Sequence, residues 1–156
     1  MGFKSPSFGQ LDYPEVIQKI AEYIKQDTDS VYKIIVGSDS QAKTGDVDFV
    51  SAIIAHRIGK GGIYFYKKQK IANQHSMQER IARETQLSLE LALKIRDDFQ
   101  HNGLAAYEPE VHIDVGMDGI SRDMVKWVTG MILGSGFVYK IKPESFAAST
   151  VADRYT

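Results

Sequence analysis

The chain has 156 residues, of which 43% are hydrophobic and 25% charged, and a formal net charge of −1. This composition is typical of a single globular domain spanning residues 1–156, in which nucleic-acid binding would depend on a local basic patch or on metal ions. The absence of cysteine excludes disulfides and thiolate catalysis. Since no run of about 18 apolar residues occurs either, we expect a cytoplasmic protein without a membrane segment.

The first half of the chain is predicted to form a helix and three strands. Asp12, Pro14 and Glu15 form a helix start signal, and an apolar stripe with helical spacing follows them. Strands are expected over residues 32–38, 49–58 and 63–71, with a polar loop over 41–48. Because the connections are short and contain glycine, these strands should pair as antiparallel hairpins.

The second half is predicted to form a long helix, then a strand, a helix and a strand. The long helix should run over 76–101, because Ser76 and Glu79 make a capping box and Gly103 supplies a stop. A strand over 111–115, a helix that begins at Ser121 and a strand over 137–141 follow. This order is typical of a parallel crossover connection.

Three aspartates stand in segments where an acid is unexpected. Asp39 follows the apolar run 34–38, Asp114 lies within the apolar segment 111–115, and Asp153 lies in a predicted helical turn. A desolvated carboxylate is costly unless it is paired, hydrogen-bonded or bound to a metal, so the pattern predicts a metal site. The alternatives are a turn aspartate at position 39, an ion-paired Asp114, and an Asp153 that stabilises a helix dipole.

The order of elements resembles the ribonuclease H fold. This is an α/β fold with a five-stranded mixed sheet, three antiparallel strands then two parallel, flanked by helices; the first helix would be an extra N-terminal element. More narrowly, segments 36–41, 112–116 and 140–143, with 148–149 and 152–154, are similar to the YkuK family of uncharacterised bacterial proteins. In such a fold Asp39 and Asp114 would lie on adjacent strands, about 4.8 Å apart.

This resemblance implies a metal-dependent nuclease acting on RNA, DNA or a hybrid, with two Mg²⁺ or Mn²⁺ ions held by four acids. Asp39, Asp114 and Asp153 would supply three of these catalytic ligands, and the long helix would supply the fourth. Glu84 is the predicted helix acid because it lies at the border of the apolar stripe. Glu79 already has a role as the partner of Ser76, and is the reserve candidate.

Basic residues suggest a second, weaker site for nucleic acid. Lys67, Lys68 and Lys70 lie beside tyrosines on the third predicted strand, and Arg122 lies in the first turn of a helix that follows a glycine loop. Such residues bind phosphates, but a lysine-rich strand is also typical of a solvated sheet edge. A non-catalytic nucleic-acid-binding or scaffold domain is therefore the alternative to a nuclease.

The chain departs from the ribonuclease H pattern in one respect. Many ribonuclease H enzymes carry a histidine in the loop before the last helix, whereas the last histidine here is His112, in the fourth predicted strand. In those enzymes the histidine helps product release or proton transfer. We therefore expect this role to be absent here or to be filled by another residue.

Overall fold

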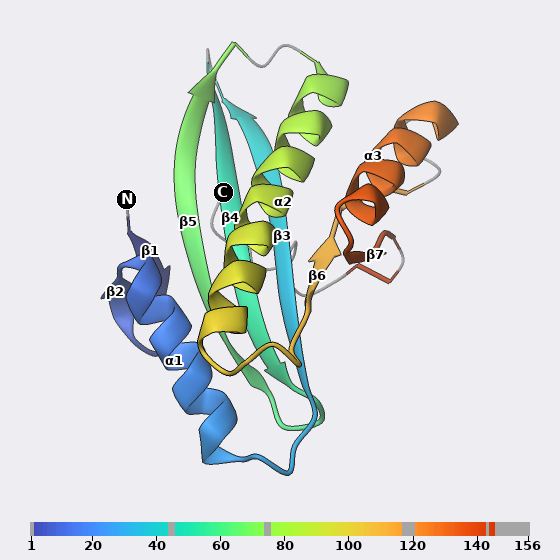
Figure 1. The fold of residues 1–156 in the computed structure, drawn as a ribbon. Helices are drawn as coiled ribbons and strands as arrows, with labels where there is room; N and C mark the ends of the chain where they lie inside the picture. The colour runs from blue at the N-terminus through green and yellow to red at the C-terminus, as the bar shows by residue number, and fades with distance from the viewer. Residues whose placement is uncertain (1, 44–45, 74–75, 117–120, 143, 146–156) are drawn as a thin grey trace.

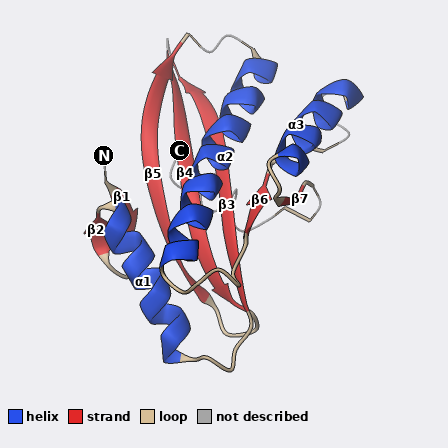
Figure 2. Cartoon of the chain, in the orientation of Figure 1, coloured by secondary structure: helices blue, strands red, loops and turns tan. Residues whose placement is uncertain are grey.

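A computed structural model describes residues 2–43, 46–73, 76–116, 121–142 and 144–145. It shows one mixed sheet of seven strands with three helices packed against it (Figures 1 and 2). The elements are, in chain order, β1 (Phe3–Ser5), β2 (Gly9–Leu11), α1 (Tyr13–Gln26), β3 (Tyr32–Lys43), β4 (Asp46–Arg57), β5 (Gly62–Ala72), α2 (Met77–His101), β6 (Pro109–His112), α3 (Arg122–Gly134) and β7 (Val138–Lys140).

The strand order across the sheet is β2-β1-β5-β4-β3-β6-β7. Strands β3, β4 and β5 pair in antiparallel fashion, and β6 and β7 continue the sheet in parallel. This confirms the predicted arrangement of three antiparallel and two parallel strands, with α1 as an additional N-terminal helix. The predicted number of five strands is too low, because the hairpin β1–β2 extends the sheet beyond β5.

The prediction of a polar loop over 41–48 is wrong. Strand β3 continues to Lys43 and β4 begins at Asp46, so only two residues separate them, and the pairing extends to Lys43↔Asp46. Backbone pairing in a long hairpin satisfies the peptide groups whatever the polarity of the side chains. Asp39 therefore lies inside β3, paired with Val50, and does not follow the strand.

The helix starts follow the local signals in the sequence. Asp12 caps α1, and both hydrogen bonds of its capping box with Glu15 are present. Ser76 caps α2 by accepting a hydrogen bond from the Glu79 backbone. Each such cap satisfies backbone N–H groups that have no partner within the helix, which is why short sequence patterns locate helix starts well.

All three helices contribute to a core on one face of the sheet, which we call the helix face (Figure 1). Ile34 and Val36 of β3 belong to this core, whereas Ile35 belongs to a smaller cluster with Ala52 and Ile54 on the opposite face. Because side chains alternate along a strand, Ser38 and Ser40 lie on the helix face and Asp39 on the opposite face.

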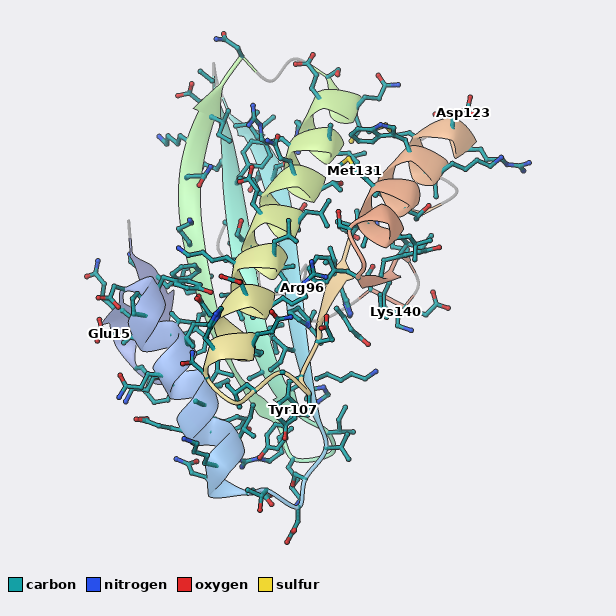
Figure 3. All side chains as sticks on the ribbon, viewed as in Figure 1. Glu15, Arg96, Tyr107, Asp123, Met131 and Lys140 are labelled. Atoms are coloured by element: carbon teal, nitrogen blue, oxygen red, sulfur yellow. The ribbon has the colours of Figure 1, made fainter. Side chains whose placement is uncertain are left out.

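A contact made by Arg96 joins α2 to the segment after α3. Arg96, labelled in Figure 3, donates a hydrogen bond to the Ser135 carbonyl, and its guanidinium lies 4.4 Å from the centroid of the Phe137 ring. The contact fixes α3 beside α2 and so helps to set the path of the chain that leads to β7. Over the described ranges, no helix has the length and apolar character needed to cross a membrane.

Candidate metal centre

Glu84 lies on the buried side of α2, with only 5% of its surface exposed. The side chain accepts a hydrogen bond of 2.5 Å from the Ser40 hydroxyl of β3. Burial raises the pKa of its carboxyl to about 7; the Ser40 hydrogen bond and the charge of Arg80 oppose this rise, and the charge of Asp114 adds to it. Glu84 is therefore a buried carboxyl that interacts electrostatically with a second acid from another element.

Ser40 and Arg80 hold Glu84 in place. The Arg80 guanidinium donates through Nε to the Ser40 hydroxyl at 3.1 Å and through Nη2 to the Ser40 carbonyl at 2.9 Å. The Ser40 hydroxyl thus accepts from Arg80 and donates to Glu84. Neither residue was predicted from sequence, although Arg80 stands one helical turn before Glu84, a spacing at which side chains interact.

Ser40→Ala is expected to raise the pKa of Glu84 further, because the variant loses a hydrogen bond that stabilises the charged carboxylate. The measurement is an NMR titration of the Glu84 side-chain carboxyl carbon between pH 4 and pH 9. Ser88→Ala is the matched control: Ser88 is also buried on α2, and its hydroxyl has no hydrogen-bond partner in the described part of the chain. An unchanged or lower pKa in Ser40→Ala would contradict the assigned role.

Asp114 lies two residues beyond the end of β6 and pairs with Lys142. Its Oδ1 is 3.2 Å from the Lys142 ammonium, and 25% of the side chain is exposed. In the parallel pairing of β3 with β6, Gly37 is opposite His112. Asp39, inside β3, and Asp114, beyond the end of β6, are each two residues further along, so the two acids lie at corresponding positions on neighbouring segments that run in the same direction.

Asp39 is half-buried, and its Oδ1 accepts a hydrogen bond from the backbone N–H of Ser40 at 2.9 Å. Strand alternation directs it away from the face that carries Ser40 and Glu84. Among the residues that the structure describes, no three Asp, Glu or His side chains gather closely enough to hold a metal ion. The fourth predicted ligand, Asp153, lies outside the described residues.

The donor chemistry of these acids nevertheless fits a hard divalent cation. Mg²⁺ and Mn²⁺ prefer carboxylate oxygens, and Mg²⁺ is commonly held by one or two carboxylates with the remaining positions filled by water or phosphate. The pKa of Glu84 is raised partly by the negative charge of Asp114. A cation beside the two carboxyls would offset both the burial and this repulsion.

The other two glutamates of α2 have separate roles at its surface. Glu79 is exposed at the start of the helix, where its backbone N–H bonds to the hydroxyl of Ser76. Glu90 is also exposed and accepts a hydrogen bond from the Gln86 side chain at 3.2 Å. Glu84 is the acid of α2 that is buried against β3.

The predicted basic cluster does not form one surface. Lys67 lies over the ring of Phe3 on the helix face. Lys68 pairs at 3.6 Å with Asp48, and by alternation Lys70 shares its face, opposite the helices. Arg122 is exposed as the first residue of α3, on a separate part of the molecule.

His112 is a buried residue of β6 and not a loop histidine. Its Nε2 lies 3.2 Å from a carboxylate oxygen of Glu110, and 1% of the residue is exposed. Burial lowers the pKa of His112, and the hydrogen bond to Glu110 opposes this effect.

Comparisons with known proteins agree with the sheet topology. A family model described as Ribonuclease H-like matches residues 15–156. A relative from Bacillus subtilis (strain 168), called Uncharacterized protein YkuK, is 32% identical over 166 residues, which cover 99% of this chain and 96% of the relative. No solved structure gives a significant match. The chain therefore belongs to the ribonuclease H-like family and groups within it with YkuK.

Proposed function

We propose that this protein is a divalent-metal-dependent nuclease that hydrolyses phosphodiester bonds of RNA, DNA or an RNA/DNA hybrid. The observation that carries the proposal is Glu84, a carboxyl that is 5% exposed and accepts a hydrogen bond from Ser40 of β3. Burial raises its pKa to about 7, and the charge of Asp114 adds to this rise. Perturbed carboxyls of this kind are common at sites that bind cations or transfer protons. A purely structural position would place an apolar or amide side chain there at lower cost.

In this proposal, Glu84 and Asp114 hold the cation. The family resemblance adds Asp39 and Asp153 as further ligands, although strand alternation directs the Asp39 side chain to the face opposite Glu84. When bound, Mg²⁺ or Mn²⁺ would activate the attacking water and stabilise the leaving oxygen. Ser40 and Arg80 orient the Glu84 carboxylate through the hydrogen bonds described above. Lys142 pairs with Asp114, and in this proposal its ammonium would neutralise a phosphate oxygen of the substrate.

The test combines metal titration with a substrate panel. Wild-type protein and Asp114→Asn are titrated with Mg²⁺ and Mn²⁺ by calorimetry, and each is incubated with labelled RNA, DNA and RNA/DNA hybrid. We expect metal binding at millimolar or lower concentration and cleavage of at least one substrate by the wild type, and loss of both in Asp114→Asn. Asp97→Asn, an exposed substitution on α2, is the control. Absence of metal binding in the wild type would overturn the proposal.

A non-catalytic nucleic-acid-binding or scaffold domain is the second candidate. The observation that favours it is that Asp114 is paired with Lys142, while Asp39 is bonded to the neighbouring backbone N–H. In that case the acids would stabilise the fold. Asp114→Asn would then lower the free energy of unfolding, and the wild type would bind nucleic acid equally well with EDTA and with Mg²⁺.

A further inference from the structure

A cleft of about 330 Å³ lies on the helix face between β1, β5 and α2. Its volume is at the lower end of the range of about 300–1,000 Å³ that is usual for ligand pockets. Its lining residues include none of the three acids Asp39, Glu84 and Asp114. The cleft is therefore a separate place in the fold, with enough room for a molecule of about the size of a mononucleotide.

Two lysines line the cleft, each placed over an aromatic ring. The ammonium of Lys67 lies 5.4 Å from the centroid of the Phe3 ring, and that of Lys94 lies 4.1 Å from the centroid of the Tyr13 ring. The two rings are neighbours, with centroids 6.3 Å apart. Contacts of this kind orient an ammonium without consuming its N–H donors, which stay available for a ligand.

Neither ammonium forms an ion pair within the part of the chain that the structure describes. Over the described ranges, no carboxylate lies within 4.0 Å of Lys67 or Lys94. Glu90 also lines the cleft, and its carboxylate accepts a hydrogen bond from Gln86. Two lysines and one glutamate give the lining side chains a formal charge of +1. Two lysines in one concave site, neither of them ion-paired to a described residue, favour an anionic ligand.

The remaining wall of the cleft suits the rest of a nucleotide. Leu87 and Leu91 of α2 join the two rings in an apolar surface, and Gln69 adds an amide that both donates and accepts hydrogen bonds. An apolar wall with a few polar groups and two cations matches a flat base or sugar attached to a phosphate. Inorganic phosphate would contact only the two lysines and not the apolar wall.

We propose that this cleft binds the phosphate of a nucleotide, with Lys67 and Lys94 as the phosphate ligands and the apolar wall in contact with the base. The phosphate can come from a free mononucleotide or from the phosphorylated end of a nucleic-acid strand. The site does not depend on the proposed nuclease activity, because it shares no lining residue with the carboxylates.

The experiment is an NMR titration of the ¹⁵N-labelled protein in EDTA, so that metal binding plays no part. The probes are CMP, cytidine, inorganic phosphate, and a tetranucleotide with and without a 5′-phosphate. Amide shifts at positions 67–69 and 87–94 report on the cleft. Two variants are compared with the wild type. The first is the double variant Lys67→Gln/Lys94→Gln. The second is Gln69→Phe, which fills the cleft without changing its charge.

Lys4→Gln is the matched control, because Lys4 is next to Phe3 on β1 but is exposed and alternates to the other face. We expect phosphorylated probes to shift the cleft amides, with affinity reduced about tenfold or more by the double lysine variant and by Gln69→Phe, and unchanged by Lys4→Gln. Binding of both CMP and the 5′-phosphorylated tetranucleotide would identify a nucleotide site, and binding of the tetranucleotide alone a strand-end site.

Three results would overturn the proposal. The first is the absence of cleft shifts with every phosphorylated probe, and the second is an equal loss of affinity in Lys4→Gln. The third is equal binding of cytidine and CMP, which would show that the phosphate is not recognised. Thermal unfolding of each variant verifies that the fold is retained. Because the titration contains no divalent metal, a negative result here leaves the test of the nuclease unaffected.

Discussion

Asp39→Asn is expected to lower the rate of phosphodiester cleavage by about a thousandfold, which corresponds to about 4 kcal/mol of transition-state stabilisation. The substitution removes one negative charge and preserves shape, so the hydrogen bond from the Ser40 backbone can still form with the amide oxygen. The measurement is single-turnover cleavage of the substrate identified in the panel, at saturating Mg²⁺. Asp114→Asn should show a loss of similar size.

Position 39 is the sharper test of the four-acid assignment, because strand alternation directs Asp39 to the face opposite Ser40 and Glu84. Cleavage that survives in Asp39→Asn but is lost in Asp114→Asn would show that Asp39 is not a metal ligand. Circular dichroism and urea unfolding of both variants separate catalytic loss from unfolding. Asp97→Asn should cleave at the wild-type rate.

Glu84→Gln is expected to stabilise the metal-free protein at high pH. The usual pKa of 4.5 is raised to about 7 in the folded chain, mainly by burial. Below pH 4.5 the carboxyl is protonated in both the folded and the unfolded state, and no stability is lost. Between pH 4.5 and about 7 the carboxyl ionises in the unfolded state but stays mostly protonated in the folded state, so the folded protein loses about 3 kcal/mol over this range.

Glutamine is neutral at every pH and can still accept the hydrogen bond from Ser40. The variant should therefore match the wild type near pH 4 and exceed its free energy of unfolding by about 3 kcal/mol near pH 9. Urea unfolding in EDTA across this range measures the difference, with Asp97→Asn as the control. A Glu84→Gln variant that is less stable than the wild type at pH 9 would show that the charged carboxylate is already compensated in the fold.

Added Mg²⁺ connects this stability difference to function. If Glu84 is a ligand, Mg²⁺ binds the folded wild type and stabilises it by mass action, whereas the glutamine variant binds Mg²⁺ weakly. The stability advantage of Glu84→Gln at pH 9 should therefore shrink as Mg²⁺ is added. An advantage that does not depend on Mg²⁺ would favour the non-catalytic alternative.

The parts of the fold that were predictable from sequence depend on short-range patterns. The capping box of Asp12 with Glu15 and the cap at Ser76 located the starts of α1 and α2 within a residue. The order of hairpins and crossover followed from connection lengths. The hairpin β1–β2 escaped prediction, because its strands have three residues each and are held by pairing with β5 and by packing of Phe3 and Leu11 in the core.

Only part of the candidate site could be predicted from the sequence. The sequence singled out Asp39, Glu84 and Asp114 as acids in apolar or borderline positions. It could not reveal that Asp39 lies inside a long strand, because polar residues after an apolar run resemble a loop until the partner strand β4 is known. The roles of Ser40, Arg80 and Lys142 depend on contacts across the sheet, and neighbours of that kind leave no periodic signal in the chain.

By itself, the sequence determined the elements, their order and the acids worth testing, because hydrogen bonding and apolar periodicity within each segment are local properties. The tertiary structure decided which charges interact. Glu84 acquires its high pKa only when α2 is packed on β3 and excludes water. Only in the folded chain is Asp114 close enough for its negative charge to raise that pKa further. Lys67 and Lys94, 27 positions apart, line one cleft because the fold brings β5 and α2 together there with Phe3 of β1 and Tyr13 of α1.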